Sequence, residues 1–339
     1  MRYNTLLSST LLAQLSFAQS LGDCTAFSSD GVAASQYQYY RFYDFRNMNS
    51  AGTGTQNAKG SQSRIVSNSS WQDDWYIRDY PRKSPGGYSI PVNFTPDRVY
   101  ITNATDPSTN STTILSLTTS RIDEETQDGG EILFKEFNIS YASLRVYSRV
   151  HGAPGGVAGI FTYLNDTQES DIEIFTRAPD TLIQYSNQPA SSGEPDWTPI
   201  PGATVNVSLP NRAVWTNWHV HRLDWTAGKS VFFVDGEVVN QTGLHVPVKD
   251  PPSGFYVDMW SANSSWSGSM EIGGEATLDV SWIEMLFNTT QGVQTSGEKR
   301  VCEVSQGRVE TVQQSDAVTV GLSAWMGWFT VLVVIHVLT

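Results

Sequence analysis

In the segment Gln168-Glu169-Ser170-Asp171-Ile172-Glu173-Ile174-Phe175, three carboxylic acids alternate with a serine and two isoleucines. Alternation of this kind predicts a half-buried β-strand, on which residues two apart share one face. The three acids would project from one side, about 6.6 Å apart along the strand, while the residues between them face the core. Acids this close cannot all ionise easily, so at least one pKa should rise.

Two interpretations of the acid triplet are open at this point. Outward-facing acids can form an ordinary solvated face, because repulsion between like charges two residues apart is mild in water. A protonated carboxylic acid beside an ionised carboxylate is instead the pair of groups that cleavage of a glycosidic bond requires. The rest of the chain decides between the two.

The sequence around the acid strand consists of short alternating runs separated by Gly, Pro, Asn and Asp, which is typical of an all-β domain. An Asp235-Gly236 turn indicates a tight hairpin, because Asp-Gly favours positive φ angles. We therefore predict an all-β fold over residues 19–290, a jelly-roll β-sandwich of many short strands. The expected strands besides the acid strand cover residues 113–118, 131–139, 141–151, 157–164, 219–225, 231–234, 237–239, 255–260 and 278–287.

The two ends of the chain resemble processing signals. Residues 1–18 combine a basic start, an apolar stretch and a small residue at Ala18, as in a secretory signal peptide. Residues 316–339 end in an apolar tail that no Lys or Arg follows, which favours a glycosylphosphatidylinositol attachment signal over a retained transmembrane helix. Ser305 and Ser315 are the candidate attachment points. Residues 291–315 are polar and are predicted to form a short stalk.

The cysteines and the glycosylation sequons also favour secretion. Cys24 and Cys302 are the only two cysteines, and in an oxidising compartment we expect them to form a disulfide that joins the ends of the mature chain. Many Asn-x-Ser/Thr sequons indicate that loops and strand ends lie at the surface of a secreted protein. The sequons begin at Asn68, Asn93, Asn103, Asn110, Asn138, Asn165, Asn206, Asn240, Asn263 and Asn288.

Composition limits the partners. The formal net charge of -13 argues against nucleic acid, whose phosphates need a basic patch, and agrees with a neutral or cationic polymer. No His/Cys cluster has metal-ligand spacing, so we predict neither a metal nor a cofactor. The 11 Trp and 14 Tyr residues can build a core or stack on sugar rings, and composition does not separate these uses.

An ordered set of motifs resembles glycoside hydrolase family 16 over about residues 130–287. The first hundred residues match the family only vaguely. The ordered set with this spacing favours the catalytic interpretation over the solvated face. In chain order, the motifs are Arg145-Val146-Tyr147-Ser148-Arg149, Gly159-Ile160-Phe161, Glu169-x-Asp171-x-Glu173, Trp218-His219-Val220-His221-Arg222-Leu223-Asp224-Trp225, Phe233-Val234-Asp235-Gly236, Tyr256-Val257-Asp258-Met259-Trp260 and Trp266-Ser267-Gly268.

The resemblance implies a fold and roles for the acids. Family members are jelly-roll sandwiches of two bent antiparallel sheets, with the sugar chain across the concave face. Glu169 would be the nucleophile, Asp171 its helper and Glu173 the acid/base; the residues alone treat the two glutamates alike. The single residue between Asp171 and Glu173 is similar to lichenases, xyloglucan transglycosylases and fungal wall cross-linking transglycosylases. Ser170 stands where the family usually has an aliphatic residue, which would loosen the packing beneath the acids.

Five further residues are candidates for binding the substrate, each with an ordinary structural alternative. Trp260 and Trp266 would stack on sugar rings or belong to the core. Gln184 and Asn187 lie one strand beyond the acids and would bind sugar hydroxyls or serve as ordinary loop amides. Arg177 would neutralise the acids or cap a turn.

We therefore expect a secreted, monomeric retaining β-glucanase or glucan transglycosylase that acts on cell-wall β-glucans, with chitin as a candidate acceptor. A lipid anchor would hold it at the outer membrane leaflet, against the wall, as in fungal members. The rival hypothesis is a wall protein that kept the fold and lost activity. Retention of all three acids argues against it, since a binder gains nothing from crowded carboxylates. Hydrolysis and transfer remain alternatives.

Overall fold

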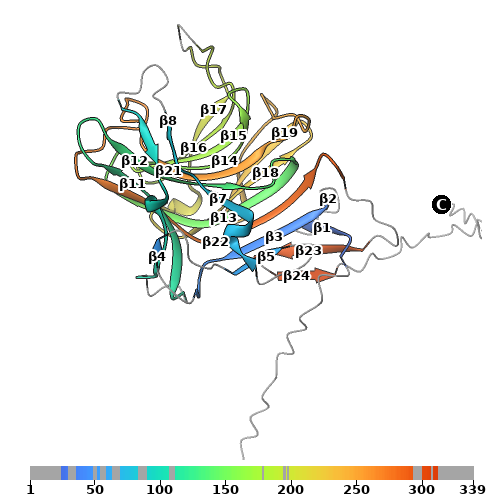
Figure 1. The fold of residues 1–339 in the computed structure, drawn as a ribbon. Coiled ribbons are helices and arrows are strands. Elements are labelled where there is room, and N and C mark those ends of the chain that lie inside the picture. Colours follow the sequence, from blue (N-terminus) through green and yellow to red (C-terminus); the bar gives the residue numbers. More distant parts are fainter. Residues whose placement is uncertain are drawn as a thin grey trace, which may run out of the picture.

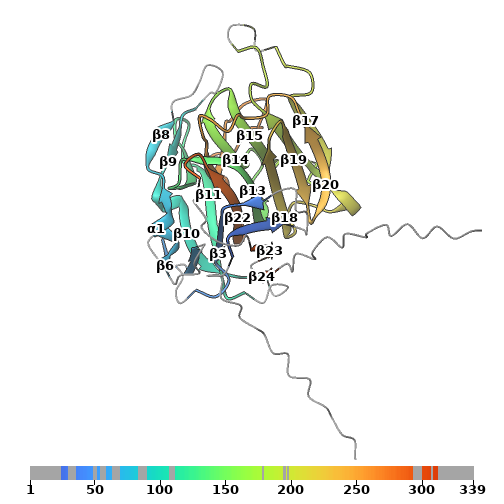
Figure 2. The same cartoon turned by 90° about the vertical axis from the view of Figure 1, so that its right-hand side faces the viewer.

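The computed structural model describes residues 24–29, 36–48, 52–53, 59–62, 69–82, 90–106, 111–177, 179–193, 196, 198–292, 300–306 and 308–311. Regular structure in these ranges is nearly all β-strand, apart from α1 (Trp71–Asp74) and the 3-10 turns η2 (Pro96–Arg98) and η3 (Pro210–Arg212). The prediction of an all-β jelly roll is confirmed. Figures 1 and 2 show the strands curling around one another in two bent layers.

The inner layer holds the acid strand at its centre. Its neighbouring strands pair antiparallel in the order β7–β12–β21–β14–β15–β16–β17. The bounds are β7 (Trp75–Ile77), β12 (Gln127–Phe134), β21 (Gly254–Trp260), β14 (Val157–Asn165), β15 (Gln168–Phe175), β16 (Leu182–Asn187) and β17 (Thr204–Ser208). β14 and β15 form a hairpin.

The outer layer is built on the two longest strands, β13 and β22, which pair along almost their whole length. From β13 the order continues through β18, β19 and β20, and from β22 it continues to β11 and β3. The bounds are β3 (Tyr39–Asp44), β4 (Gly52–Thr53), β5 (Lys59–Gln62), β6 (Ser69–Ser70), β8 (Tyr80–Arg82), β9 (Val92–Phe94), β10 (Val99–Asn103), β11 (Thr113–Arg121), β13 (Ile139–Gly152), β18 (His219–Thr226), β19 (Lys229–Val234), β20 (Glu237–Thr242) and β22 (Glu275–Thr289).

One predicted strand has different bounds in the structure. The strand expected over residues 131–139 begins at Gln127 and ends at Phe134, and Ile139 starts the next strand. Between them the chain turns: the Lys135 amide donates to the Asp74 carbonyl at 2.8 Å, and the Asn138 amide donates to the Glu136 carboxylate at 2.9 Å. A side chain that bonds a nearby backbone amide competes with the hydrogen bonds between strands, so the strand ends although the alternation of apolar and polar residues continues.

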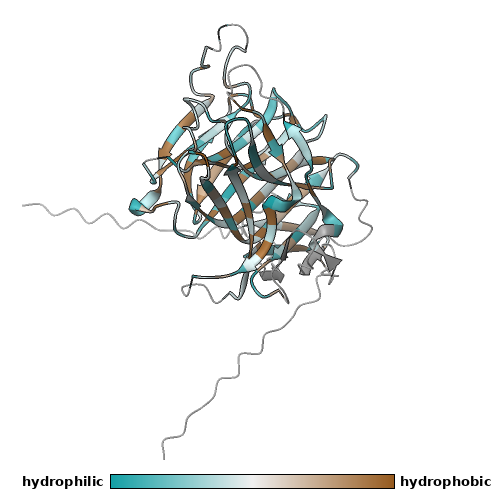
Figure 3. Ribbon diagram, turned by 60° about the vertical axis from the view of Figure 1, so that its left-hand side comes forward, coloured by the Kyte–Doolittle hydropathy of each residue, from teal (hydrophilic) through white to brown (hydrophobic). Residues whose placement is uncertain are grey.

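The main core lies between the layers. Ile160, Ile172 and Ile174 from the inner layer share one buried cluster with Leu144 and Val146 from β13, and each is at most 1% exposed. Apolar and polar residues alternate along the strands, visible in Figure 3 as brown and teal segments that succeed one another. Burial of this aliphatic face, at about 25 cal/mol per Å² of apolar surface, is what holds β15 with its other face toward solvent.

A second, small sheet ties the ends of the domain together. Its order is β2 (Gln36–Tyr37), β1 (Ala26–Ser29), β23 (Val301–Ser305) and β24 (Arg308–Thr311), with β1 and β23 parallel. Cys24 and Cys302 form the predicted disulfide, with a Cα–Cα distance of 5.7 Å. Figure 1 shows this sheet beside β3 and β22.

The same sheet corrects the predicted stalk. Residues 301–305 and 308–311 form strands of the folded domain, and Val304 is fully buried in an aromatic cluster with Phe27 and Trp282. Beneath the sheet, Arg145 forms a buried ion pair with Glu284 at 2.6 Å and contacts the Ser29 hydroxyl. The domain therefore extends past residue 290, because apolar positions alternate in this short segment as well.

The sequons divide by exposure. Asn68 and Asn110 lie outside the described residues, as do the predicted signal peptide and the anchor signal. Exposed positions are Asn93, Asn103, Asn165 and Asn206, and half-buried positions are Asn138, Asn240 and Asn288. Asn263 is a correction: it is 7% exposed, and its amide nitrogen, which would carry the sugar, donates to Gln127 at 2.9 Å. In the described ranges, no helix is long and apolar enough to cross a membrane.

Candidate active site

The acid strand β15 presents its two faces as the alternation predicts. Ile172 and Ile174 are buried in the core, while Glu169, Asp171 and Glu173 line a pocket on the opposite face. The β-pleat alone produces this division, because successive side chains of a strand point to opposite sides. The sequence therefore places all three acids at one surface, and the two-residue spacing sets their order along it.

Ser170 does not loosen the packing beneath the acids. Its hydroxyl donates to the Asn187 side-chain oxygen at 2.5 Å, and the Asn187 amide nitrogen donates to Ser230 at 3.2 Å and to the Leu244 carbonyl at 2.9 Å. Asn187 is fully buried and stands opposite Ser170 in the β15–β16 ladder, on the core face. The prediction that Asn187 binds sugar is therefore wrong, since its side chain satisfies a buried serine instead.

Gly159 on β14 forms the floor between the acid strand and the opposite wall. In the strand register it stands opposite Glu173 on one side and Asp258 of β21 on the other. A Cβ added at Gly159 would lie 2.4 Å from Asp258 Oδ1, so any side chain here would displace that carboxyl. The missing side chain thus opens a space flanked by two carboxyl groups.

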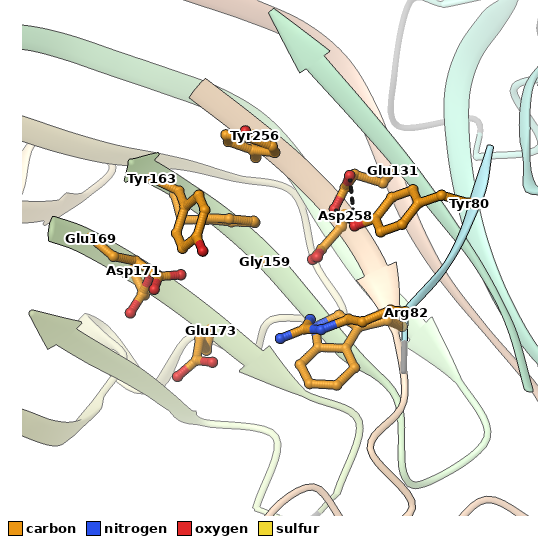
Figure 4. Close-up of a pocket in the computed structure, with 12 residues that line it drawn as sticks. Tyr80, Arg82, Glu131, Gly159, Tyr163, Glu169, Asp171, Glu173, Tyr256 and Asp258 are labelled. Atoms are coloured by element: carbon orange, nitrogen blue, oxygen red, sulfur yellow. Dashed lines mark hydrogen bonds between the residues drawn. The ribbon is translucent and has the colours of Figure 1, made fainter. Parts of the chain in front are cut away.

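The pocket combines acids, aromatic rings and one arginine (Figure 4). Two of the aromatic rings, Phe161 and Tyr256, stack at 5.1 Å between ring centroids on the floor beside Asp171. Arg82 extends from β8 with its guanidinium 4.6 Å from the Trp260 ring. The lining residues are Tyr80, Arg82, Glu131, Gly159, Phe161, Tyr163, Glu169, Asp171, Glu173, Tyr256, Asp258 and Trp260.

Burial shifts the protonation of the triplet. It raises the pKa of Glu169 to about 7 and that of Glu173 to about 7, while Arg82 opposes both shifts through its positive charge. Burial also raises the pKa of Asp171 well above its ordinary value, and the charges of Glu169 and Glu173 add to this shift. At neutral pH the group therefore holds protons that isolated carboxyls would have lost.

Two amides contact the triplet. Gln184 stands opposite Glu173 in the β15–β16 ladder and donates to Glu173 Oε2 at 2.6 Å, which lowers the pKa of that carboxyl. Gln188, just past the end of β16, donates to Asp171 Oδ2 at 3.1 Å. Gln184 was predicted as a sugar-binding residue and instead contacts an acid of the triplet; Gln188 was missed.

The opposite wall carries a second group of acids that the sequence did not single out. Glu131 of β12 and Asp258 are 3% and 2% exposed. Glu131 accepts from Arg78 Nε at 3.1 Å and from the Tyr80 hydroxyl at 3.3 Å, whereas Asp258 Oδ1 has no hydrogen-bond partner among the described residues. The available signal was the alternation Tyr256-x-Asp258-x-Trp260, which matches that of the acid strand.

The remaining candidates, Trp260, Trp266 and Arg177, differ in whether they line the pocket. Trp260 lines the pocket, whereas Trp266 packs against Phe175 at 4.9 Å and against Trp260 at 5.8 Å and does not line it. Arg177 is exposed and lies over the Phe175 ring at 4.9 Å, so the prediction that it neutralises the acids is wrong. That role belongs to Arg82, which comes from the poorly matching first hundred residues.

No set of three or more His, Cys, Asp or Glu side chains in the described part of the chain is arranged to hold a metal ion. The acids of the pocket instead face an open space between two walls, with Glu169, Asp171 and Glu173 on one side and Glu131 and Tyr80 on the other. Coupled carboxyls with pKa values near neutrality beside aromatic platforms are suited to acid/base work on a sugar chain.

Comparison with known proteins agrees with this chemistry. The model of Glycosyl hydrolases family 16 matches residues 94–284, more than half of the chain. The protein is thus a glycoside hydrolase, and it belongs to glycosyl hydrolase family 16. A search of curated proteins finds no match.

Solved structures to which this chain is similar include several glucanases. The Bacillus licheniformis β-glucanase has 18% identity and a TM-score of 0.48, covering 63% of this chain and 92% of its own. The laminarinase catalytic domain of Thermotoga maritima has 14% identity and a TM-score of 0.48, covering 64% and 92%. The laminarinase of Rhodothermus marinus has 14% identity and a TM-score of 0.47, covering 64% and 91%.

Proposed function

We propose that this protein is a retaining endo-β-glucanase or glucan transglycosylase that acts on cell-wall β-glucans by double displacement. The observation that carries the proposal is the triplet itself. Glu169 and Glu173 face one pocket from a single strand, and burial raises the pKa of each to about 7. Because the two groups are coupled, near neutral pH they hold one proton between them, which is the state that a nucleophile and an acid require.

In the first step the Glu169 carboxylate attacks the anomeric carbon while Glu173 protonates the departing glycosidic oxygen. The C–O bond to the leaving sugar breaks as the ester bond to Glu169 forms. Esterification removes the charge of Glu169, which is one of the charges acting on this coupled group. The pKa of Glu173 then falls, so it can take a proton from water or from a sugar hydroxyl in the second step. The family resemblance supplies the assignment of Glu169, rather than Glu173, as nucleophile.

The walls of the pocket support a neutral sugar chain as the substrate. Five carboxyl groups and a single arginine line the pocket, so a polyanionic glycan would be repelled. Tyr163 and Tyr256 line the pocket with aromatic rings of the kind that stack on pyranose rings. Family membership favours β-glucan over other neutral polymers, and chitin remains a candidate acceptor.

Location at the cell surface, as a monomer, belongs to the same proposal. The disulfide between Cys24 and Cys302 and the exposed sequons support secretion. The apolar tail over residues 316–339 supports a lipid anchor that would hold the pocket against the wall polymer.

The stereochemistry of the first product tests the mechanism directly. Proton NMR during cleavage of a β-glucan oligosaccharide should show the β-anomer at the earliest time points, and a slow fluorinated donor should leave a sugar ester on Glu169. Appearance of the α-anomer first would reject double displacement and the assignment of Glu169. Product lengths from labelled β-glucans, with and without chitin oligomers, separate hydrolysis from transfer: products longer than the donor require transfer.

A further inference from the structure

Two exposed aromatic side chains lie against each other at the edge of the inner layer. Tyr76 of β7 is 47% exposed, and Phe137, in the turn after β12, is 45% exposed. Their rings are stacked, with the centroids 6.3 Å apart and the planes at 26°. The other large apolar side chains that are exposed in the described ranges are aliphatic. Single exposed apolar residues are ordinary in folded proteins, whereas a contiguous aromatic pair points to a ligand.

The strand pattern places Tyr76 on the face that carries the acids. Its neighbours in β7, Trp75 and Ile77, pack in the main core. Successive side chains of a strand point to opposite sides, so Tyr76 lies on the pocket face of the inner layer. Tyr80 and Arg82 follow Tyr76 at even spacings along the chain, and both line the pocket.

A row of directly paired residues connects Tyr76 to the acid strand. Tyr76 stands opposite Leu133 of β12, and Leu133 stands opposite Tyr256 of β21. Tyr256 in turn pairs with Phe161 of β14, and Phe161 pairs with Asp171. Residues paired across a sheet share one face, so the row leads from the acid triplet to the edge of the layer. Its four steps of about 4.8 Å place Tyr76 about 19 Å from Asp171, a distance that several sugar units span.

Gly254 of β21 lets the pocket aromatics and the exposed pair form one surface. A Cβ added at Gly254 would meet Tyr256 Cε2 at 3.0 Å, Leu133 Cδ1 at 3.4 Å and Phe137 Cδ1 at 3.6 Å. Because glycine has no side chain, these three apolar groups approach one another over its backbone. The apolar surface is therefore continuous from the ring of Tyr256 to that of Phe137.

We propose that Tyr76 and Phe137 form a distal sugar-binding site for the part of a β-glucan chain that extends beyond the pocket across the inner layer. This inference rests on the proposed function, in which the pocket holds the sugar unit that reacts. The face of an aromatic ring carries partial negative charge and attracts the C–H groups of a pyranose ring. The Lys135 ammonium, 5.0 Å from the centroid of the Tyr76 ring, supplies donors for the hydroxyls around such a ring. Tyr76 lies outside residues 94–284, so the family match does not account for this site.

The experiment measures kcat and KM of the full chain on β-glucan oligosaccharides of increasing length. Tyr76→Ala and Phe137→Ala each remove one ring, and Val238→Ala, which shortens an exposed side chain on β20 of the outer layer, is the matched control. For chains long enough to reach the pair, each ring deletion should raise KM about tenfold and leave kcat unchanged, because stacking far from the reacting bond is equal in ground and transition states. For a trisaccharide, every variant should stay within about twofold of the wild type.

Two kinetic results overturn the inference. Losses that are equal at every chain length would show that the pair acts on the fold or on the pocket, and thermal melts of the variants would tell these apart. No loss at any length would show that the pair binds no part of the sugar chain.

The sequon at Asn138 offers a second source of sugar rings, because it directly follows Phe137. The ring deletions are therefore repeated in an Asn138→Gln background, which removes the attachment point. The chain-length effect should persist there. A fall in melting temperature in Tyr76→Ala that disappears with Asn138→Gln, without a chain-length effect, would assign the pair to the protein's own glycan and overturn the inference.

Affinity electrophoresis in a gel that contains soluble β-glucan separates this inference from the proposed function. The polymer should retard the wild type and Val238→Ala more than Tyr76→Ala or Phe137→Ala. A wild-type protein that binds in this way but cleaves no β-glucan overturns the proposed function and leaves the distal site standing. Equal retardation of all four proteins, or none of the wild type, overturns the distal site.

Discussion

The two walls of the pocket contain buried acids that differ in their partners. On β15, Glu173 accepts from the neutral amide of Gln184. On the opposite wall, Glu131 accepts from the guanidinium of Arg78 and the phenol of Tyr80. Burial raises the pKa of the acids on both walls, and at Glu131 the positive charge of Arg78 opposes that shift.

The two walls therefore differ in what they can do. The wall of Glu169, Asp171 and Glu173, here the exchanging wall, can change its protonation, whereas the wall of Glu131 and Asp258, here the supporting wall, keeps its shape. An amide stabilises a carboxylate modestly and leaves its protonation free to change during a reaction. A guanidinium contributes a full charge and fixes the carboxylate in place, so a change of protonation there would break an ion pair. The triplet can thus perform acid/base work, while Glu131, with Arg78 and Tyr80, supports the floor from the other side.

The largest expected effect comes from removing a carboxyl from the exchanging wall. Glu169→Gln and Glu173→Gln are almost isosteric, and each should reduce kcat/KM on β-glucan by several orders of magnitude. Both should fold with unchanged or higher stability, because a crowded buried acid is removed. The measurement pairs initial rates with denaturant unfolding. A variant that unfolds readily yet turns over normally would contradict the division between the walls.

Removing a carboxyl from the supporting wall should act mainly on stability. Glu131→Gln leaves the Arg78 guanidinium without its partner, and we expect a loss of about 1–2 kcal/mol, kept small because Arg78 is 34% exposed at its side chain. Activity should fall far less than in Glu169→Gln. Tyr80→Phe is the matched control, since it removes a single donor to Glu131 and should lose less. Urea titration measures both; equal stability with abolished activity would assign chemistry to Glu131.

Stability should fall as pH rises, because the exchanging wall binds protons more tightly in the folded state. On folding, the pKa values of Glu169 and Glu173 move from an ordinary 4.5 to about 7. Each of the two groups contributes its full stabilisation below its unfolded pKa and loses it as pH rises through its folded pKa. For each group the free energy of unfolding falls by at most about 1.4 kcal/mol for each pH unit between those two pKa values. Urea unfolding across this range should show the decline, and Glu173→Gln should flatten it. A wild-type curve flat over this range would refute the raised pKa values.

The acid strand and its two faces could be predicted from the sequence because a period of two is a local property. The all-β fold followed from the same alternation repeated along the chain. The opposite wall could not, because Tyr80 and Arg82 reach the pocket, and Arg78 reaches Glu131, through pairing between strands far apart in sequence. Glu131 and Asp258 are likewise neighbours only through the ladder between β12 and β21.

The wrong assignments have the same origin. Asn187 and Arg177 are close to the acids in sequence but not in the pocket. Asn187 lies on the core face of its strand, because an offset of one residue along a strand reverses the face, and Arg177 lies beyond the end of β15. Asn263 has a sequon, yet its amide is committed to Gln127 in the core. A sequon specifies three residues and says nothing about burial. Residues 301–305 appeared too polar for a domain, and long-range pairing with β1 gives them their place.

The smallest expected effect is at Asp258, whose Oδ1 has no hydrogen-bond partner among the residues that the structure describes. Burial raises its pKa well above the ordinary value, and the negative charge of Glu131 adds to the shift. At pH values below this raised pKa Asp258 is a neutral acid, which asparagine imitates, so at low pH Asp258→Asn should keep kcat/KM within about threefold of the wild type.

The effect of this substitution should grow with pH, because Asp258 can ionise and asparagine cannot. Once charged, Asp258 adds repulsion across Gly159 to Glu173, which lies opposite that glycine on the other side. That repulsion keeps Glu173 protonated to higher pH, and Asp258→Asn removes it, so the ratio of kcat/KM in Asp258→Asn to that in the wild type should fall from about 1 at low pH as the alkaline limb is crossed. The measurement is a paired pH–rate profile with a thermal melt at each pH. A drop of more than tenfold at low pH would mean that the carboxyl itself contacts the sugar, and Asp258 would then move from the supporting wall to the reacting one.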